Sequence, residues 1–349
     1  LQQARAAEIE RARAALLADR ATRDLVGGGA PPADPTRDAS QCLAAPSVRC
    51  LLAEASESAK AVSDTQRRDW AFAEILAVQT RAGLGADALV TLRHIEDPRR
   101  ILRALRDIAV SQAAHGELAA AVAAAARIPD EAVRGEALNA IAGLQAATAT
   151  TGGDAPTIEH AAGLEPRFRA IDLIDLAMVR IDAHDAPGAQ ALLEEGAHTI
   201  AAVDKPHRRE YPRFRLALAR LALAEQTASA QEAHDAVAAL SEPHLRAQAY
   251  ALLSALQQRL GEDPGAAESA AEEAIGAIPS RLRRIWTAAD IAMTLKRDGA
   301  TATAEHYLEI ARETAATYQS PWGRARALAR LADAYLLLAE DDGDGLLRP

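Results

Sequence analysis

Aromatic residues, cysteines and long apolar runs are all scarce in this sequence. Only 3% of its 349 residues are Phe, Trp or Tyr, although 49% are hydrophobic, because much of the apolar content is alanine. Alanine is the best helix former, and its small side chain lets helices pack closely. No run approaches the roughly 20 apolar residues that a membrane-spanning helix needs. The composition therefore predicts a helical protein without a membrane span.

Basic residues are outnumbered by acidic ones. The sequence has 39 Lys and Arg residues and 49 Asp and Glu residues, so its net charge is -10. Proteins that bind nucleic acid usually present a basic face to the phosphates, so a nucleic-acid partner is not expected. The nine histidines are scattered, and H-E-x-x-H, G-x-S-x-G and G-x-x-x-x-G-K-[ST] are all missing. We therefore predict no catalytic residues, no bound metal and no cofactor.

The two cysteines, Cys42 and Cys50, flank Pro46 and Ser47. A continuous helix would hold the two Cα atoms about 12 Å apart, whereas a disulfide needs roughly 4.4 to 6.8 Å. Proline disfavours helix in the residue before it, and Ser47 is a good N-cap, so the chain can fold back here. We predict a disulfide that staples the first helical hairpin of an exported protein. The alternative is a pair of buried free thiols in a cytosolic protein.

The first residue, Leu1, is not a methionine, as expected after removal of a secretory signal or after trimming of the sequence. Together with the predicted disulfide, this favours a periplasmic location, with the cytoplasm as the alternative.

A helix-opening signature returns at intervals of roughly 33 to 42 residues, which is typical of stacked helical hairpins. An arginine follows each opening residue by three to five positions. The copies start at Asp64, Asp97, Asp130, Glu165, Glu242, Pro279 and Ser320, and their arginines are Arg67, Arg100, Arg134, Arg169, Arg246, Arg283 and Arg324; a degenerate copy starts near Lys205. These arginines either brace neighbouring repeats by pairing with the acids or form a ladder that grips anionic groups.

The clearest repeat starts at Asp97, with Pro98 in the first helical position and Ile101, Leu105 and Ile108 in a stripe at helical spacing. A turn at Gly116 leads to a second helix over 117–128. The same pattern predicts paired helices from residue 48 onward, including one over 155–164 and an unpaired final helix over 322–339.

Small residues and glycine turns in these hairpins follow the spacing of the tetratricopeptide repeat, which the chain resembles over residues 48–339. The spacing is kept by Ala109, Gly116 and Ala121, and again by Ala292, Gly299 and Ala304. The resemblance implies an all-α, right-handed solenoid of antiparallel hairpins whose first helices line a concave, partner-binding groove.

Four segments are predicted along the chain: an amphipathic helix over 1–25, a Gly/Pro-rich linker over 26–40, a solenoid of seven to eight repeats over 41–340 and an acidic tail over 341–349. The first helix either caps the solenoid or forms an arm that recruits a partner or pairs with a second copy, which would make a homo-oligomer.

Two columns of polar residues recur in register on the first helices of the predicted hairpins. The candidate groove residues are the amides Gln79, Gln112 and Gln145 and the acids Glu74, Asp107 and Asp175. If the columns face the groove, their amides and carboxylates would bind an extended protein or peptide partner. A polar face turned toward solvent gives the same pattern.

The sequence thus predicts a non-enzymatic protein-interaction scaffold of the bacterial cell envelope. One alternative is the helical domain of a larger cell-wall enzyme, because the superhelices of some lytic transglycosylases look broadly similar. Another is a cytosolic regulator that senses a ligand.

We expect a disulfide in the protein purified from its native host. Non-reducing peptide mapping by mass spectrometry should find the peptides of Cys42 and Cys50 joined and lighter by two hydrogens. Free thiols on both cysteines would support the cytosolic alternative instead.

Overall fold

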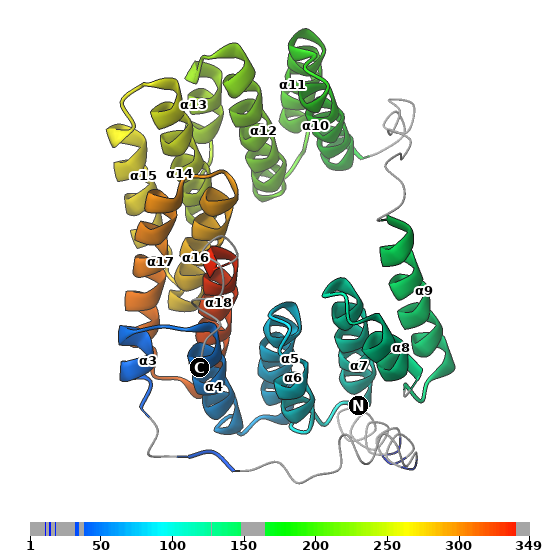
Figure 1. Ribbon diagram of the computed structural model, residues 1–349. Coiled ribbons are helices and arrows are strands. Elements are labelled where there is room, and N and C mark those ends of the chain that lie inside the picture. The colour runs from blue at the N-terminus through cyan, green and yellow to red at the C-terminus, as the bar shows by residue number, and fades with distance from the viewer. Residues whose placement is uncertain are drawn as a thin grey trace. The chain divides into compact units, whose positions relative to one another are not determined.

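Helices are the only regular elements in the described part of the computed structural model (Figure 1). The structure describes residues 38–126, 128–147 and 165–339, together with residues 11, 14, 18 and 32–34, and for 143–147 it describes the backbone alone. The predictions for the N-terminal helix, most of the linker, the helix over 155–164 and the acidic tail lie outside these residues. None of the described helices is both long and apolar enough to cross a membrane.

The chain forms two compact units, the first from residues 1–152 and 315–349 and the second from residues 153–314. The first unit contains α3 (Ser40–Ala44), α4 (Val48–Lys60), α5 (Thr65–Arg81), α6 (Gly85–Leu92), α7 (Pro98–Ala114), α8 (Leu118–Ala126), α9 (Glu131–Ala147) and α18 (Pro321–Ala339). The second contains α10 (Pro166–Asp182), α11 (Ala186–Ala201), α12 (Pro206–Thr227), α13 (Gln231–Ala238), α14 (Pro243–Leu260), α15 (Gly265–Gly276), α16 (Arg281–Arg297) and most of α17 (Thr301–Ala316).

Helix starts follow the predicted capping residues. The side chain of Asp64 accepts a hydrogen bond from Arg67 N at 2.8 Å, and that of Asp97 accepts one from Arg99 N at 3.0 Å. Asp130 accepts from Val133 N at 2.9 Å. Each bond satisfies one of the N–H groups that the first turn of a helix leaves without a partner. The repeating opening signature therefore marks real helix starts.

Each described hairpin pairs a first helix with a shorter second helix, and within each unit consecutive first helices also contact one another. In the second unit α10 packs on α11, α12 on α13 and α14 on α15, while α10, α12 and α14 adjoin in series. The core lies between them. Ala170, Ile174, Leu193 and Ile200 join one hairpin to Leu216 and Leu223 of the next. These two neighbouring hairpins thus share one apolar cluster.

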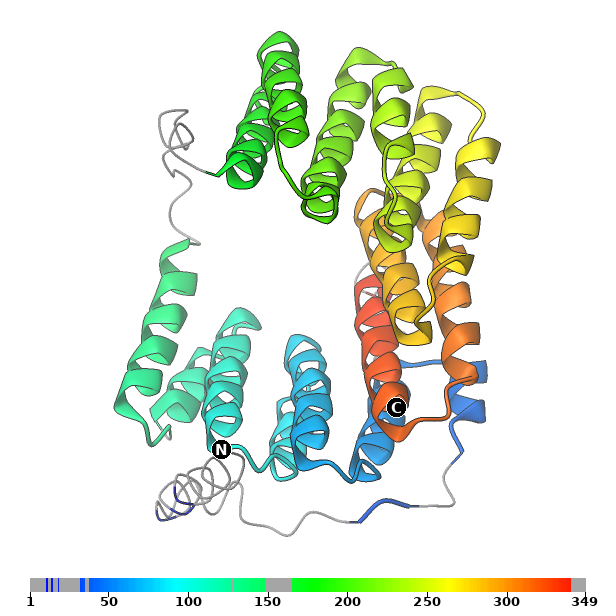
Figure 2. The ribbon, with the colours of Figure 1, turned by 180° about the vertical axis from the view of Figure 1, so that it is seen from behind.

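The prediction that the final helix is unpaired is wrong. α18 packs on α4 about as extensively as α10 packs on α11, and it also contacts α5 (Figure 2). α18 therefore acts as the first helix of a composite hairpin whose second helix is α4. Local sequence spacing cannot reveal this pairing, because the two helices lie at opposite ends of the chain.

Arg326 is the polar centre of the contact between α18 and α5. Its guanidinium donates two hydrogen bonds of 2.8 Å to the Glu74 carboxylate. It also lies 5.0 Å from the ring centroid of Trp70 and 4.7 Å from that of Trp322. Arg326 is only 8% exposed, so its charge is shielded from water, whereas the Trp70 side chain that it contacts is 45% exposed.

The predicted disulfide is present, with the Cα atoms of Cys42 and Cys50 5.8 Å apart. The chain reverses between α3 and α4, and Ser47 Oγ accepts from Cys50 N at 3.2 Å as the N-cap of α4. The break at Pro46 and Ser47 therefore brings the two sulfurs together as expected.

Two buried carboxylates hold the start of the next first helix. Asp69 on α5 accepts from the N–H groups of Glu96 and Asp97 at 2.8 to 3.1 Å, and Glu210 on α12 accepts from Ser241 and Glu242 at 3.0 and 3.1 Å. Each carboxylate follows the residue that caps its own helix by five positions. The carboxylate five positions after the cap therefore anchors the start of the next first helix in both units.

Some arginines near helix starts bind the carbonyl groups at the end of the preceding repeat. Arg134 donates to the Ile128 carbonyl at 2.8 Å, Arg209 to the Val203 carbonyl at 2.6 Å and Arg284 to the Ile278 carbonyl at 2.9 Å. Arg134 is one of the arginines of the predicted signature, whereas Arg209 and Arg284 are not. The bond of Arg134 braces adjacent repeats, but its acceptor is a backbone carbonyl rather than the predicted acid.

Replacing Glu210 by Gln should destabilise the protein in a pH-dependent way. Burial raises the pKa of Glu210, but the N–H donors of Ser241 and Glu242 and the charge of Arg213 outweigh it, so the pKa lies below its ordinary value of 4.5. The carboxylate therefore contributes stability that is present above pH 4.5 and is lost as the pH falls through the lowered pKa. We expect Glu210→Gln to cost about 1 to 3 kcal/mol at pH 7.

Urea denaturation followed by circular dichroism between pH 7 and pH 3 measures this difference. The cost should shrink toward the acid end of the series, where the wild-type carboxyl is also neutral. Glu305→Gln, at an exposed residue of α17, is the matched control and should change little. A cost for Glu210→Gln that does not vary with pH would contradict the assignment.

Candidate functional site

The position of a residue on a first helix can be counted from its cap, namely Asp64 for α5, Asp97 for α7, Glu165 for α10 and Lys205 for α12. At 3.6 residues per turn, positions 3, 6, 10 and 14 share one face, which we call the acid face. Position 15 lies about 140° around the helix from position 10. The two predicted columns therefore occupy different faces, because the acids stand at position 10 and the glutamines at position 15.

All three predicted acids are engaged by arginines. Glu74 pairs with Arg326 of α18, and Asp175 pairs with Arg215 of the next first helix. Asp107 pairs with its neighbour Arg106 at 2.8 Å. Glu74 and Asp175 therefore link adjacent first helices, and the charge of the acid face is largely balanced within the protein.

The acid face also carries exposed apolar side chains. Trp70 and Tyr211, both at position 6, are 45% exposed, and Phe168 at position 3 is 48% exposed. Val179, at position 14 of α10, is 39% exposed. Three of the eleven aromatic residues of the chain thus remain at the surface of first helices, although aromatic side chains usually fill cores.

The glutamines at position 15 lie away from this face, close to the second helices. Gln79 is only 5% exposed, Gln112 is half-buried, and the Oε1 atom of each has no hydrogen-bond partner. Gln145 belongs to α9, and its side chain lies outside the described residues. The structure therefore does not bring the amides and the acids into one groove.

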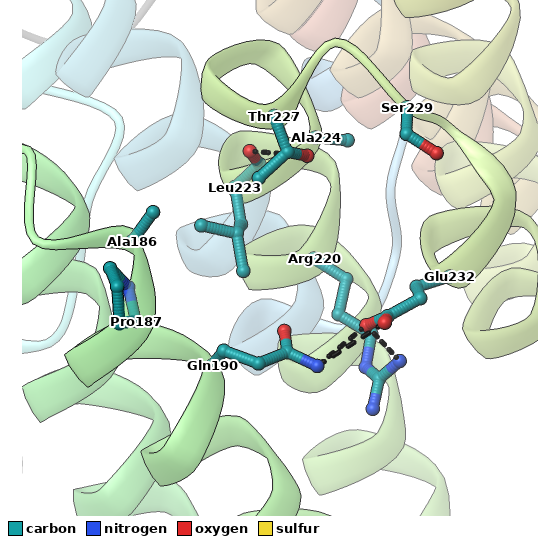
Figure 3. A pocket seen from close by; sticks show the side chains of 9 residues that line it. All are labelled: Ala186, Pro187, Gln190, Arg220, Leu223, Ala224, Thr227, Ser229 and Glu232. Carbon is teal, nitrogen blue, oxygen red and sulfur yellow. Dashed lines mark hydrogen bonds and ion pairs between the residues drawn. The ribbon is translucent and has the colours of Figure 1, made fainter.

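In the second unit, position 15 of α12 is Arg220, which lines a cavity of about 420 Å³ at the ends of α11, α12 and α13 (Figure 3). Its Nη1 atom donates to Glu232 Oε2 at 3.0 Å, and the amide of Gln190 donates to the same carboxylate at 3.0 and 3.2 Å. Leu223 and Pro187 supply apolar walls. Arg220 Nη1 and the Gln190 amide thus both bind Glu232, whereas Arg220 Nε is buried without a hydrogen-bond partner.

The equivalent cavity of the first unit has a volume of about 240 Å³ and lies between the second helices α4 and α6, with Gln79 of α5 in its lining. Arg49 of α4 donates to Asp87 of α6 at 3.2 Å across it. The remaining lining residues are Leu52, Ala53, Ser56, Lys60, Leu84, Val90, Thr91 and His94. This cavity is smaller than the one described in the second unit.

His94 forms part of this lining and stacks on Phe72 with ring centroids 4.6 Å apart. Burial lowers the pKa of His94, and the nearby charge of Lys60 lowers it further. The imidazole is therefore neutral at pH 7, so it offers one donor and one acceptor rather than a positive charge.

No group of three His, Cys, Asp or Glu residues in the described ranges is arranged to hold a metal ion. Sequence reasoning found Gln79 but missed Arg220 and Glu232. Arg220 stands at position 15 of α12, as Gln79 does in α5. Counting position 15 in the helix after Lys205 would therefore have identified Arg220 from the sequence.

No protein-family model matches the chain, and no curated protein or solved structure shows significant similarity to it.

Proposed function

We propose that the chain is a non-enzymatic scaffold of the cell envelope that binds a partner protein or peptide along the acid face of its first helices. In this proposal the hairpins stack as in tetratricopeptide repeats, into a right-handed superhelix whose concave side carries that face. The observation that carries it is the exposure of Trp70, Phe168 and Tyr211. Large aromatic side chains are enriched where proteins bind one another and often dominate the binding energy.

The balance of charge on the acid face indicates the kind of partner. Glu74 and Asp175 are each held by an arginine of a neighbouring first helix, so a bound peptide would have to break these pairs to reach the carboxylates. The aromatic rings remain 45 to 48% exposed, although Arg326 lies 5.0 Å from the Trp70 ring centroid and Arg167 lies 5.5 Å from that of Phe168. The partner is therefore an extended or helical segment anchored by apolar side chains, and its affinity should depend weakly on salt.

A cell-envelope location is supported by the disulfide between Cys42 and Cys50, because disulfides persist mainly in oxidising compartments.

Selection of a phage-displayed random peptide library on the immobilised full chain tests the proposal. The affinity of selected peptides is then measured by fluorescence anisotropy for the wild type and for the double variant Phe168→Ser/Tyr211→Ser. We expect the double variant to bind at least about tenfold more weakly, because each lost anchor typically costs more than 1 kcal/mol.

Val122→Ser is the matched control, since Val122 is 44% exposed but belongs to the second helix α8. It should leave the affinity unchanged. Selected peptides that bind the double variant as tightly as the wild type would overturn the proposal.

A further inference from the structure

The cavity at the ends of α11, α12 and α13 combines apolar walls with a few polar groups (Figure 3). Its volume is about 420 Å³, which falls within the range of roughly 300 to 1,000 Å³ in which proteins bind small molecules. Leu223 and Ala224 of α12 form one apolar wall, and Ala186 and Pro187 of α11 form another. The cavity therefore fits a small ligand with an aliphatic part, and its polar groups decide what else the ligand carries.

One positive and one negative side chain line the cavity next to each other. Arg220 Nη1 donates to Glu232 Oε2 at 3.0 Å, so the two charges compensate each other. A ligand with a net charge would add a charge without a counter-ion beside Arg220, whose side chain is only 17% exposed, and this is costly. A ligand that carries one charge of each sign avoids this cost.

Three accessible groups of the cavity have hydrogen-bonding capacity left over. Arg220 Nη2 has no partner among the described residues, and Nε is the only nitrogen of this guanidinium that is buried without one. The Gln190 amide nitrogen donates to Glu194 and Glu232. Figure 3 shows this nitrogen directed at Glu232 and the amide oxygen directed away from it, so the oxygen is left as an acceptor. Ser229 is exposed, and its hydroxyl group has no partner in the described chain.

An α-amino acid matches this set of groups. Its ammonium and carboxylate groups are attached to the same carbon atom, so they lie close together, as the charged groups of Arg220 and Glu232 do. The ligand carboxylate can accept from Arg220 Nη2 and from the Ser229 hydroxyl group, and the ammonium group can donate to Glu232 and to the Gln190 oxygen. The pair between Arg220 and Glu232 stays intact, and an aliphatic side chain packs on Leu223.

The two turns beside the cavity have a backbone conformation that is costly for their residues. Ala228 has a φ of 53°, and His184, in the turn before α11, has a φ of 57°. The other described residues with positive φ are glycines, which adopt this conformation without steric cost. Thr227 and Ser229 line the cavity on either side of Ala228. Because strained backbone is concentrated at functional sites, these turns support a binding site independently of the charges.

We propose that the cavity at the ends of α11, α12 and α13 binds a free α-amino acid with an aliphatic side chain, held by Arg220, Glu232 and Gln190. Arg220 stands at position 15 of α12, about 140° around the helix from position 10 of the acid face. The site therefore does not depend on the proposed peptide binding, and Phe168→Ser/Tyr211→Ser should leave it intact.

Isothermal titration calorimetry of the full chain with leucine and two analogues tests the proposal. Isocaproate is leucine without its ammonium group, and isoamylamine is leucine without its carboxylate group. Leucine should bind saturably. Each analogue should bind at least about tenfold more weakly, because it loses the hydrogen bonds of one charged group. This comparison uses only the wild-type protein, so it does not depend on the folding of a variant.

The double variant Arg220→Gln/Glu232→Gln removes both charges together, so neither is left unpaired. It should weaken leucine binding at least about tenfold while the thermal midpoint changes little. Arg169→Gln/Glu195→Gln is the matched control, since Arg169 pairs with Glu195 at 2.7 Å between α10 and α11, and it should leave the affinity unchanged. Absence of leucine binding to the wild type, an analogue that binds as tightly as leucine, or equal affinity of the wild type and Arg220→Gln/Glu232→Gln for leucine would each overturn the proposal.

Discussion

The pairing of α18 with α4 is the contact on which the first unit depends. The second helix α4 precedes every complete hairpin and has no first helix before it within the described chain, yet Val48, Leu51 and Leu52 are almost fully buried. α18 supplies the missing apolar partner from the other end of the chain. Glu74 and Arg326, which join the neighbouring helices α5 and α18, are 252 residues apart in sequence.

Bringing such distant residues together has an entropic cost of about 5 kcal/mol for a flexible loop of this length. Leu328 and Leu331 of α18 are at most 1% exposed, and burial of such a side chain contributes about 1.5 to 3 kcal/mol. Arg326 adds a shielded ion pair and two cation–π contacts. The closing contact is therefore favourable, but it forms only when the chain extends through α18.

Equivalent positions of the repeats carry different residues, which have different structural roles. Position 5 carries the helix-holding carboxylates Asp69 and Glu210, but it is alanine in α10, where Ala170 is fully buried in the core. Position 15 carries a glutamine in α5 and an arginine in α12, and only the arginine has a carboxylate partner on the next second helix. Equivalent positions in the shared backbone register therefore carry side chains with different hydrogen-bond partners.

Local features of the fold could be predicted from sequence, whereas features that depend on distant packing could not. Capping by Asp64 and Asp97 follows from propensities within a few residues. The same holds for the Cys42–Cys50 disulfide, which depends on the chain reversal at Pro46 and Ser47. The pairing of α18 with α4 and the engagement of Glu74 by Arg326 depend on which helices meet in space. The sequence correctly predicts Gln79 and Glu74 on the same helix. The five residues between them correspond to a rotation of about 140°, so they cannot face one groove.

Hydrogen exchange measured by mass spectrometry on a charge-swap series tests the central claim most directly. Arg326→Glu places a second acid against Glu74, so it should loosen α18 and speed amide exchange in α4 at the opposite end of the chain. Adding Glu74→Arg should restore much of the protection of α4. If Arg326→Glu speeds exchange within α18 while α4 stays as protected as in the wild type, the composite hairpin does not hold the first unit together.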